Sequence, residues 1–226
     1  CALSHWGAYI ASDAALNHAA EQILGHCGEQ PYALTEDHFL YDCLLESFRA
    51  ARKAIEDAAA AAEVPERSMH CTLTLALYDG SALWYCHAGD DGIVVQFEDG
   101  FVKQVTGRQK GEEASSVYPL QSGEGSWQVG KVASKAHGAA VAFAMATDGV
   151  LDAFSFEEEL YKETEGCCMG VYYPFIKNAF YDGAGHPAEP KGALSAYERL
   201  MLDPSYRSRV TDDLTLLTVI CPPALI

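Results

Sequence analysis

Three short aspartate-centred segments, far apart along the chain, carry the residue types best suited to metal chemistry. They are residues 88–92, 146–150 and 211–215, which read Ala-Gly-Asp-Asp-Gly, Ala-Thr-Asp-Gly-Val and Thr-Asp-Asp-Leu-Thr. A carboxylate beside a glycine at a strand end is exposed enough to bind a ligand and rigid enough to bind it well. Converging carboxylates repel one another unless a cation lies between them, and hard divalent ions such as Mg²⁺ and Mn²⁺ take oxygen ligands. The pattern therefore predicts an acidic, oxygen-ligand metal centre on a β-scaffold.

Apolar runs next to these segments predict the strands that would position them. Residues 71–78 alternate between apolar and polar types, and Asp79-Gly80 is typical of a hairpin turn. Further strands over 82–88, 93–97 and 101–105 would complete an antiparallel meander. The first acidic segment would then lie between two strands of this meander.

The rest of the chain predicts helices and further strands, with short strand candidates over 118–120 and 127–132. Residues 139–146 form a continuous apolar run that predicts a central strand, and residues 214–221 predict a final one. Helical periodicity indicates helices over about 10–24, from a cap at 35–37 to Pro65, and through most of 156–202. Helices, then strands, then helices and a last strand predict an α+β domain in which helices pack on antiparallel sheets.

Each acidic segment also has a structural explanation when it is taken alone. Asp91-Gly92 could be a simple turn, Asp148 could cap a short helix, and Asp212-Asp213 could be a charged loop before an edge strand. Taken singly, these explanations would be preferred. The order of the segments and the strands beside them favour a shared site instead.

The segments resemble the motifs of the metal-dependent type 2C protein serine/threonine phosphatases, most closely those of the bacterial branch. Gly89-Asp90-Asp91 is similar to the family's Gly-Asp-Ser, with Asp91 in place of the serine. Thr147-Asp148-Gly149 resembles its Ser-Asp-Gly, and residues 212–215 resemble its Asp-Asn-x-Thr. Residues 71–74 resemble the family's Thr-Thr-hydrophobic strand. The resemblance covers nearly the whole chain except residues 160–200.

This resemblance implies a fold, an activity and a set of site residues. The fold would be a β-sandwich of two antiparallel sheets flanked by helices in α-β-β-α layers. Asp148 and Asp212 would ligate one of two paired ions, and Asp90 would help Asp148 to hold a further, weaker one, giving two or three Mg²⁺ or Mn²⁺ ions. A water activated by the metal would attack the phosphorus of a phosphorylated protein substrate, without a covalent phosphoenzyme.

The family also carries an Asp-Gly pair near its N-terminus, and this pair does not precede the first predicted helix here. We expect a single catalytic domain over residues 1–226 that lacks its first strands and this pair, which would lie just upstream of Cys1. His5 would lie near the pair and is the candidate leaving-group acid, although taken alone an ordinary surface or core histidine would be preferred. His87 falls within a predicted strand and is expected to be half-buried.

Charge and cysteine content indicate which binding partners and which cellular compartment to expect. The net charge of −17 repels phosphate backbones and anionic lipid, which argues against nucleic acid and membrane partners. The eight cysteines form no C-x-x-C pair, which suits free thiols in a reducing cytoplasm. We expect a cytoplasmic monomer. Two alternatives remain: a catalytically degenerate phosphatase fold that acts as a binding or regulatory module, and an unrelated metal hydrolase with similar acidic turns.

Overall fold

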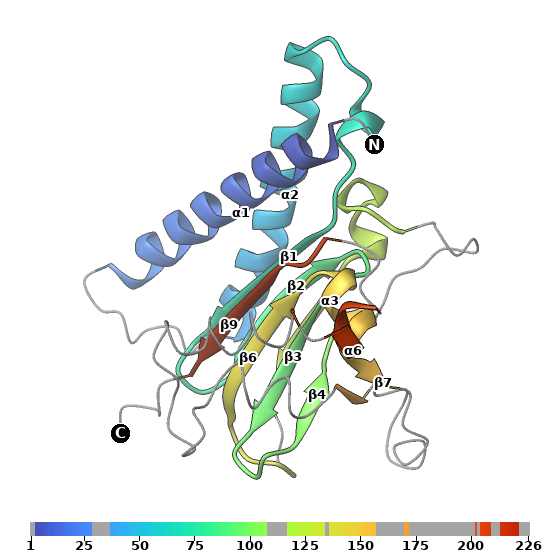
Figure 1. Cartoon of the computed structure of the whole chain (residues 1–226). Coiled ribbons are helices and arrows are strands. Elements are labelled where there is room, and N and C mark those ends of the chain that lie inside the picture. The colour runs from blue at the N-terminus through green and yellow to red at the C-terminus, as the bar shows by residue number, and fades with distance from the viewer. Residues whose placement is uncertain are drawn as a thin grey trace. The chain divides into compact units, whose positions relative to one another are not determined.

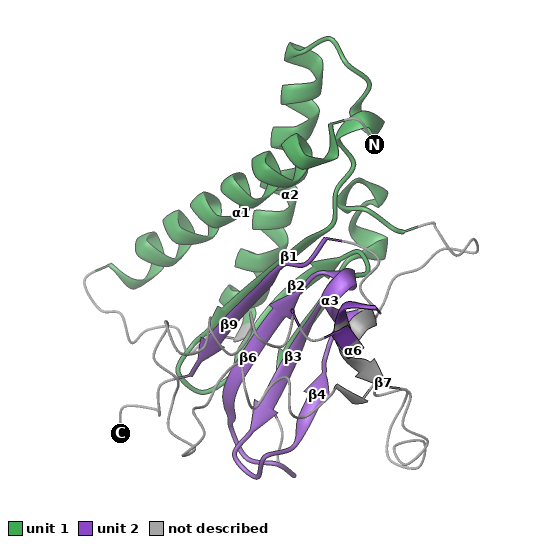
Figure 2. Ribbon diagram, viewed as in Figure 1, with its two compact units in different colours: residues 1–90, 108–132 green, residues 91–107, 133–226 purple. Residues whose placement is uncertain are grey.

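The computed structural model in Figure 1 describes most of the chain. The described residues are 3–28, 37–107, 117–133, 136–156, 170–171, 202, 204–208 and 213–221. They fall into two compact units (Figure 2). Unit 1 comprises Cys1–Asp90 and Arg108–Val132, and unit 2 comprises Asp91–Gly107 and Ala133–Ile226.

Unit 1 combines two long helices with a three-stranded antiparallel sheet. Its strands are ordered β1-β2-β5, with Leu73 of β1 opposite Ala88 of β2 and Cys86 of β2 opposite Val129 of β5. The elements are α1 (Ser4–Cys27), α2 (Asp37–Ala61), the 3-10 turns η1 (Glu66–Met69), η2 (Leu120–Ser122) and η3 (Glu124–Ser126), and the strands β1 (Leu73–Tyr78), β2 (Leu83–Ala88) and β5 (Gln128–Val132).

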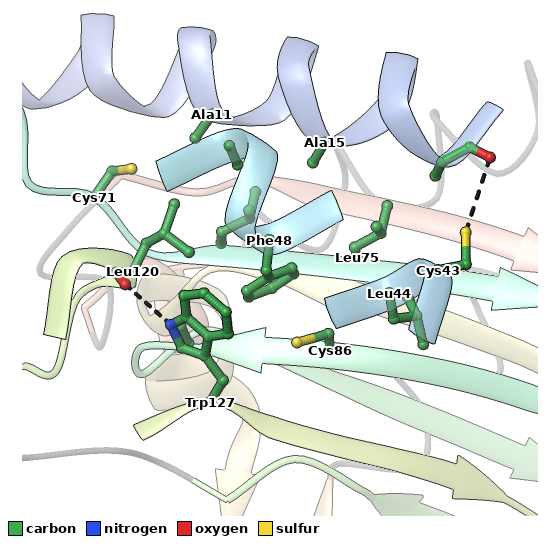
Figure 3. Close-up of a cluster of buried hydrophobic side chains, with 14 of the residues drawn as sticks. Ala11, Ala15, Cys43, Leu44, Phe48, Cys71, Leu75, Cys86, Leu120 and Trp127 are labelled. Carbon is green, nitrogen blue, oxygen red and sulfur yellow. Dashed lines mark hydrogen bonds between the residues drawn. The ribbon is translucent and has the colours of Figure 1, made fainter. Parts of the chain in front are cut away.

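Apolar side chains from α2 and from one face of the sheet form the core of unit 1 (Figure 3). Because side chains alternate along a strand, Leu73 and Leu75 of β1 share a face with Cys86 of β2. Phe48 of α2 is fully buried, and its ring makes a T-shaped contact with that of Trp127 at a centroid distance of 5.4 Å. The indole N–H of Trp127 donates to the carbonyl of Leu120, so this large side chain is buried with its polar atom satisfied.

Helix α1 joins this core through its smallest residues. Its buried positions are Gly7, Ala11, Ala15 and Ala19, spaced at four-residue intervals on one face. A Cβ at Gly7 would collide with the carbonyl oxygen of Met69, so the backbone of α1 lies directly against this neighbour. Backbone contact at Gly7 therefore adds to the packing of the partly buried Ile10 and Ile23 of α1 against the core.

Unit 2 is built on a four-stranded antiparallel sheet ordered β4-β3-β6-β9. Strand β6, whose sequence is continuously apolar, pairs with β3 on one side and β9 on the other, as predicted for a central strand. The elements are β3 (Gly92–Phe97), β4 (Val102–Gln104), β6 (Ala140–Ala146), β9 (Leu216–Ile220), the helices α3 (Asp148–Phe154) and α6 (Pro204–Arg207), and the short pair β7 (Ser155–Phe156) and β8 (Gly170–Val171).

The predicted fold class is confirmed: the two main sheets of the described residues are antiparallel and have flanking helices. The predicted single meander is wrong, because β2 pairs with β5 whereas β3 pairs with β6. The chain leaves the first sheet at Gly89, whose φ of 132° lies in a region that favours glycine. The predicted helical region over 156–202 lies largely outside the described residues. The prediction of one domain over 1–226 stays a prediction.

The first helix is longer than its periodicity indicated, since it begins at Ser4 rather than near residue 10. Within the described residues, none of the helices combines the length and apolar character needed to cross a bilayer.

Candidate metal centre

Three strand ends of unit 2 meet at one end of its sheet. Gly92 at the start of β3 lies opposite Ala146 at the end of β6, and Ala146 lies opposite Leu216 at the start of β9. Neighbouring antiparallel strands run in opposite directions, so residues before β3, after β6 and before β9 share one end of the sheet. Asp91, Asp148 and Asp213 are therefore all attached to the same end.

Thr147 joins the second acidic segment to the third. Its backbone N–H donates to the Thr215 carbonyl at 3.1 Å, and its hydroxyl accepts from the Thr215 N–H at 3.0 Å. The same hydroxyl donates to the Asp213 carbonyl at 3.1 Å. The Thr-Asp-Gly and Asp-Asp-x-Thr segments, separated by more than sixty residues in the sequence, are thus hydrogen-bonded to each other. The sequence identified Thr147 only as a motif residue; because Thr215 takes part through its backbone atoms, its side chain gave no signal for this pair.

Asp148 occupies the first position of α3. Its Oδ1 accepts from the N–H of Gly149 at 2.8 Å, and the Thr147 carbonyl accepts from the N–H groups of Val150 and Leu151. Asp148 is half-buried. The helix-start role that the sequence allowed is therefore present. A carboxylate has two oxygens with about four lone-pair positions, so this bond leaves capacity for a cation.

Asp90 follows β2 in unit 1 and is buried, with 8% of its surface exposed. The turn before it is held by His87, whose Nε2 lies 3.0 Å from the Gly89 carbonyl and whose Nδ1 lies 2.9 Å from the Thr74 hydroxyl. His87 is completely buried, so the prediction that it is half-buried was wrong. The strand pattern indicated the direction of this side chain but not what would surround it.

Gly92 packs tightly beside the first acidic segment. A Cβ built on it would lie 2.5 Å from Thr106 Oγ1, 3.1 Å from Gln104 Nε2 and 3.2 Å from Leu151 Cδ1. Thr106 Oγ1 also accepts the backbone N–H of Ile93 at 3.0 Å. The absence of a side chain at Gly92 therefore allows a buried threonine to hold the start of β3.

The structure says less about the two remaining predicted site residues, His5 and Asp212. His5 lies on the exposed surface of α1 in unit 1, with its ring 5.7 Å from that of Trp6, and its role as a leaving-group acid stays a prediction. Asp212 lies outside the described residues. Among those that are described, no three or more His, Cys, Asp or Glu side chains are grouped to hold a metal ion. The donors at the strand ends of unit 2 are all oxygens, which fits Mg²⁺ or Mn²⁺ better than softer metals.

Cys43 and Arg49 have the C-x5-R spacing of phosphatases that use a cysteine nucleophile, but the structure argues against that chemistry. Both residues lie on helix α2 rather than in a loop. Burial raises the pKa of the Cys43 thiol, which disfavours the thiolate. The Arg49 guanidinium binds the carboxylates of Glu46 and Glu124. This pair is therefore structural.

The sequence and fold are similar to those of known phosphatases. Residues 1–170 match the family described as protein phosphatase 2C. No curated protein matches the sequence. The catalytic domain of the serine/threonine phosphatase PstP, solved with two manganese ions, is 17% identical with a TM-score of 0.55, over 91% of this chain and 80% of that one.

Two further solved structures share the fold. The Mycobacterium tuberculosis serine/threonine phosphatase PstP/Ppp is 18% identical with a TM-score of 0.54, over 92% of this chain and 81% of that one. A sex-determining protein of Caenorhabditis elegans is 13% identical with a TM-score of 0.59, over 96% of this chain and 55% of that one. At these identities the likeness establishes the fold alone.

Proposed function

This chain belongs to the protein phosphatase 2C family, and from that premise we propose that it is a metal-dependent protein serine/threonine phosphatase. Its substrates would be phosphorylated proteins, and its reaction the hydrolysis of their phosphoester bonds with Mg²⁺ or Mn²⁺. The observation that carries this proposal is the Thr147 hydrogen-bond pattern, which joins two of the three acidic segments at one end of the unit 2 sheet.

The ligands we propose are the three aspartates that the motifs single out. Asp148 and Asp212 would bind one of two paired ions, and Asp90 would help Asp148 to hold a further one. The two manganese ions of the related PstP catalytic domain support a two-ion centre. Bound divalent ions would lower the pKa of a bound water and neutralise charge on the phosphoryl oxygens.

The protein's own residues would position and complement these ions. Thr147 fixes the start of the segment that leads into β9 against the start of α3, which limits the movement of the carboxylate on Asp148. His5 would protonate the leaving group. The net charge of −17 means that a phosphorylated substrate needs local positive charge, which divalent ions can provide. A cytoplasmic monomer without nucleic acid or membrane partners is part of the same proposal.

A second candidate function is a catalytically degenerate, regulatory or binding module with the same fold. It is favoured by Asp91, an acidic residue in place of the serine in the first motif. The added negative charge beside Asp90 would change the affinity of that position for cations. Isothermal titration calorimetry of the full-length protein with MnCl₂ separates the two functions, because the absence of any divalent-ion binding favours the module.

Activity on a phosphopeptide tests the enzyme directly. We expect full-length protein to release phosphate only with Mn²⁺ or Mg²⁺, and chelation by EDTA to stop the reaction. Asp148→Asn should abolish turnover, because the amide keeps the size of the side chain but removes its charge. Asp13→Asn is the matched control, since this exposed aspartate of α1 lies outside the motifs. Turnover without a divalent ion, or an active Asp148→Asn variant, contradicts the proposal.

A further inference from the structure

His87 lies two residues before Gly89 and three before Asp90, on the face of the unit 1 sheet opposite the one that packs on α1 and α2. Its strand position faces Thr74 directly across the β1–β2 pair, and its side chain bonds that threonine. No part of the ring is exposed. A buried histidine with a partner at each nitrogen is held in one orientation, which makes it suitable for fixing the backbone beside it.

The two partners determine which nitrogen carries the proton. The Gly89 carbonyl can only accept a hydrogen bond, so Nε2 must donate to it. In the neutral ring Nδ1 is then an acceptor, and the Thr74 hydroxyl donates to it. The Gly89 carbonyl therefore sets the tautomer, while Thr74 anchors the ring at Nδ1 and so holds its tilt.

The conformation of Gly89 sets the direction of the backbone that leads to Asp90. Its φ of 132° is open to glycine and strained for other residues, and the peptide that begins at its carbonyl carries the nitrogen of Asp90. A hydrogen bond to that carbonyl fixes the plane of this peptide. A bond from His87 therefore acts on the peptide that carries the buried Asp90.

We propose that His87 is a positioning residue for the metal ligand Asp90, acting through the Gly89 carbonyl with Thr74 as its own anchor. This inference rests on the proposed function, because it requires Asp90 to bind a divalent ion. Outer partners that orient metal ligands typically contribute a factor of about 10–100 in affinity. The effect should fall on the further, weaker ion assigned to Asp90 rather than on the ion that Asp148 and Asp212 bind.

A pair of neutral amide variants separates positioning from packing. His87→Gln reaches far enough to place an N–H where Nε2 lies, whereas the shorter His87→Asn ends near the level of Nδ1 and cannot reach the Gly89 carbonyl. Both remove the ring, so both should lower the Tm of the metal-free protein. Titration of full-length protein with MnCl₂ should show the weakest binding step reduced about tenfold in His87→Asn and close to wild type in His87→Gln. Thr74→Val, which removes the anchor at nearly constant volume, should weaken the same step if His87→Asn does not fold.

Three results overturn the inference. Equal Mn²⁺ affinities in His87→Asn, Thr74→Val and wild type would show that the Gly89 bond does not affect Asp90. Equal losses at every binding step in both amide variants would show a structural role only. In the first two outcomes, a wild-type protein that still binds Mn²⁺ leaves the proposed function standing. A wild-type protein that binds no divalent ion contradicts both this inference and the proposed function.

Discussion

Replacing Gly92 by alanine tests whether close packing at the start of β3 supports the acidic end of the unit 2 sheet. The backbone of Gly92 does not have a positive φ, so an alanine there meets no conformational strain and its cost comes from contacts alone. The new Cβ would lie 2.5 Å from Thr106 Oγ1, whereas ordinary contact begins at 3.4 Å. The threonine must therefore move by about 0.9 Å, the difference between these two distances.

That displacement is large enough to break the 3.0 Å hydrogen bond from the Ile93 N–H to Thr106 Oγ1. An unsatisfied buried donor costs about 1–3 kcal/mol, and overpacking a close-packed site costs about 1–3 kcal/mol more. Reduced entropy of the unfolded chain offsets about 0.4–1 kcal/mol. Together these terms predict that Gly92→Ala lowers the free energy of unfolding by about 1–6 kcal/mol.

The assay is urea-induced unfolding followed by circular dichroism, with Gly125→Ala as the matched control. A Cβ at Gly125 would meet no heavy atom within 4 Å, and this glycine lacks a positive φ, so that variant should leave stability nearly unchanged. In a Thr106→Ala background the hydroxyl is absent and Gly92→Ala should cost much less, which gives a coupling energy of about 0.5–3 kcal/mol. Equal costs of Gly92→Ala in the two backgrounds would refute this reasoning.

Two further variants test other contacts. Thr147→Val removes the hydroxyl that accepts from Thr215 and donates to Asp213, so it should cost about 1 kcal/mol of stability and weaken Mn²⁺ binding, whereas Thr147→Ser should retain both; unaltered binding and stability in Thr147→Val would contradict the link. Burial raises the pKa of Asp79, but hydrogen bonds from Ala82, Trp84 and Ser81 outweigh burial and hold that pKa below its ordinary value. Because the folded pKa is depressed, this stabilisation is present above the unfolded pKa and is lost as pH falls through the folded one. Urea unfolding at a series of acidic pH values should therefore show a shallower loss of stability in Asp79→Asn than in wild type, and identical pH profiles would count against the assignment.

Local sequence patterns predicted the strands because each depends on nearby residues. Alternation marked β1, a continuous apolar run marked β6, and Asp79-Gly80 marked the hairpin between β1 and β2. The structure gives the local cause of that turn: Asp79 Oδ1 accepts from the N–H groups of Ser81 and Ala82. Turns of this kind are encoded by the residues that form them.

Strand partners were harder to predict because they are set by distant residues. Strands β2 and β3 are separated by only a few residues, which is equally compatible with a hairpin and with entry into separate sheets. In the structure Cys86 of β2 lies opposite Val129 of β5, and Val94 of β3 lies opposite Ala144 of β6, so each strand's partner is distant in sequence. Neither partner can be recognised from the pattern around Gly89.

The sequence predicted the order of the acidic motifs and their strands, but not the hydrogen bonds that support the candidate site. The motifs placed Asp148 at the end of a strand, and the structure shows the strand and the short helix that follows it. The roles of Thr147 and His87 depend on cross-strand hydrogen bonds, which have no one-dimensional signature. The start of α1 was missed because Gly7 weakens a helix by propensity, whereas here its lack of a side chain permits contact with Met69.

The way in which α1 is attached has a consequence for tracing the ancestry of this protein. Its docking face consists of Gly7, Ala11, Ala15 and Ala19, and larger residues there would push the helix away from its neighbours. The outward positions face no such restriction and can drift. Substitution should therefore be rapid over most of the helix and slow at the four small residues that recur every four positions. Glycine and alanine are common in all proteins, so alignment scores give little weight to this spacing. Relatives of this segment are therefore better recognised by the spacing of its small residues than by overall sequence identity.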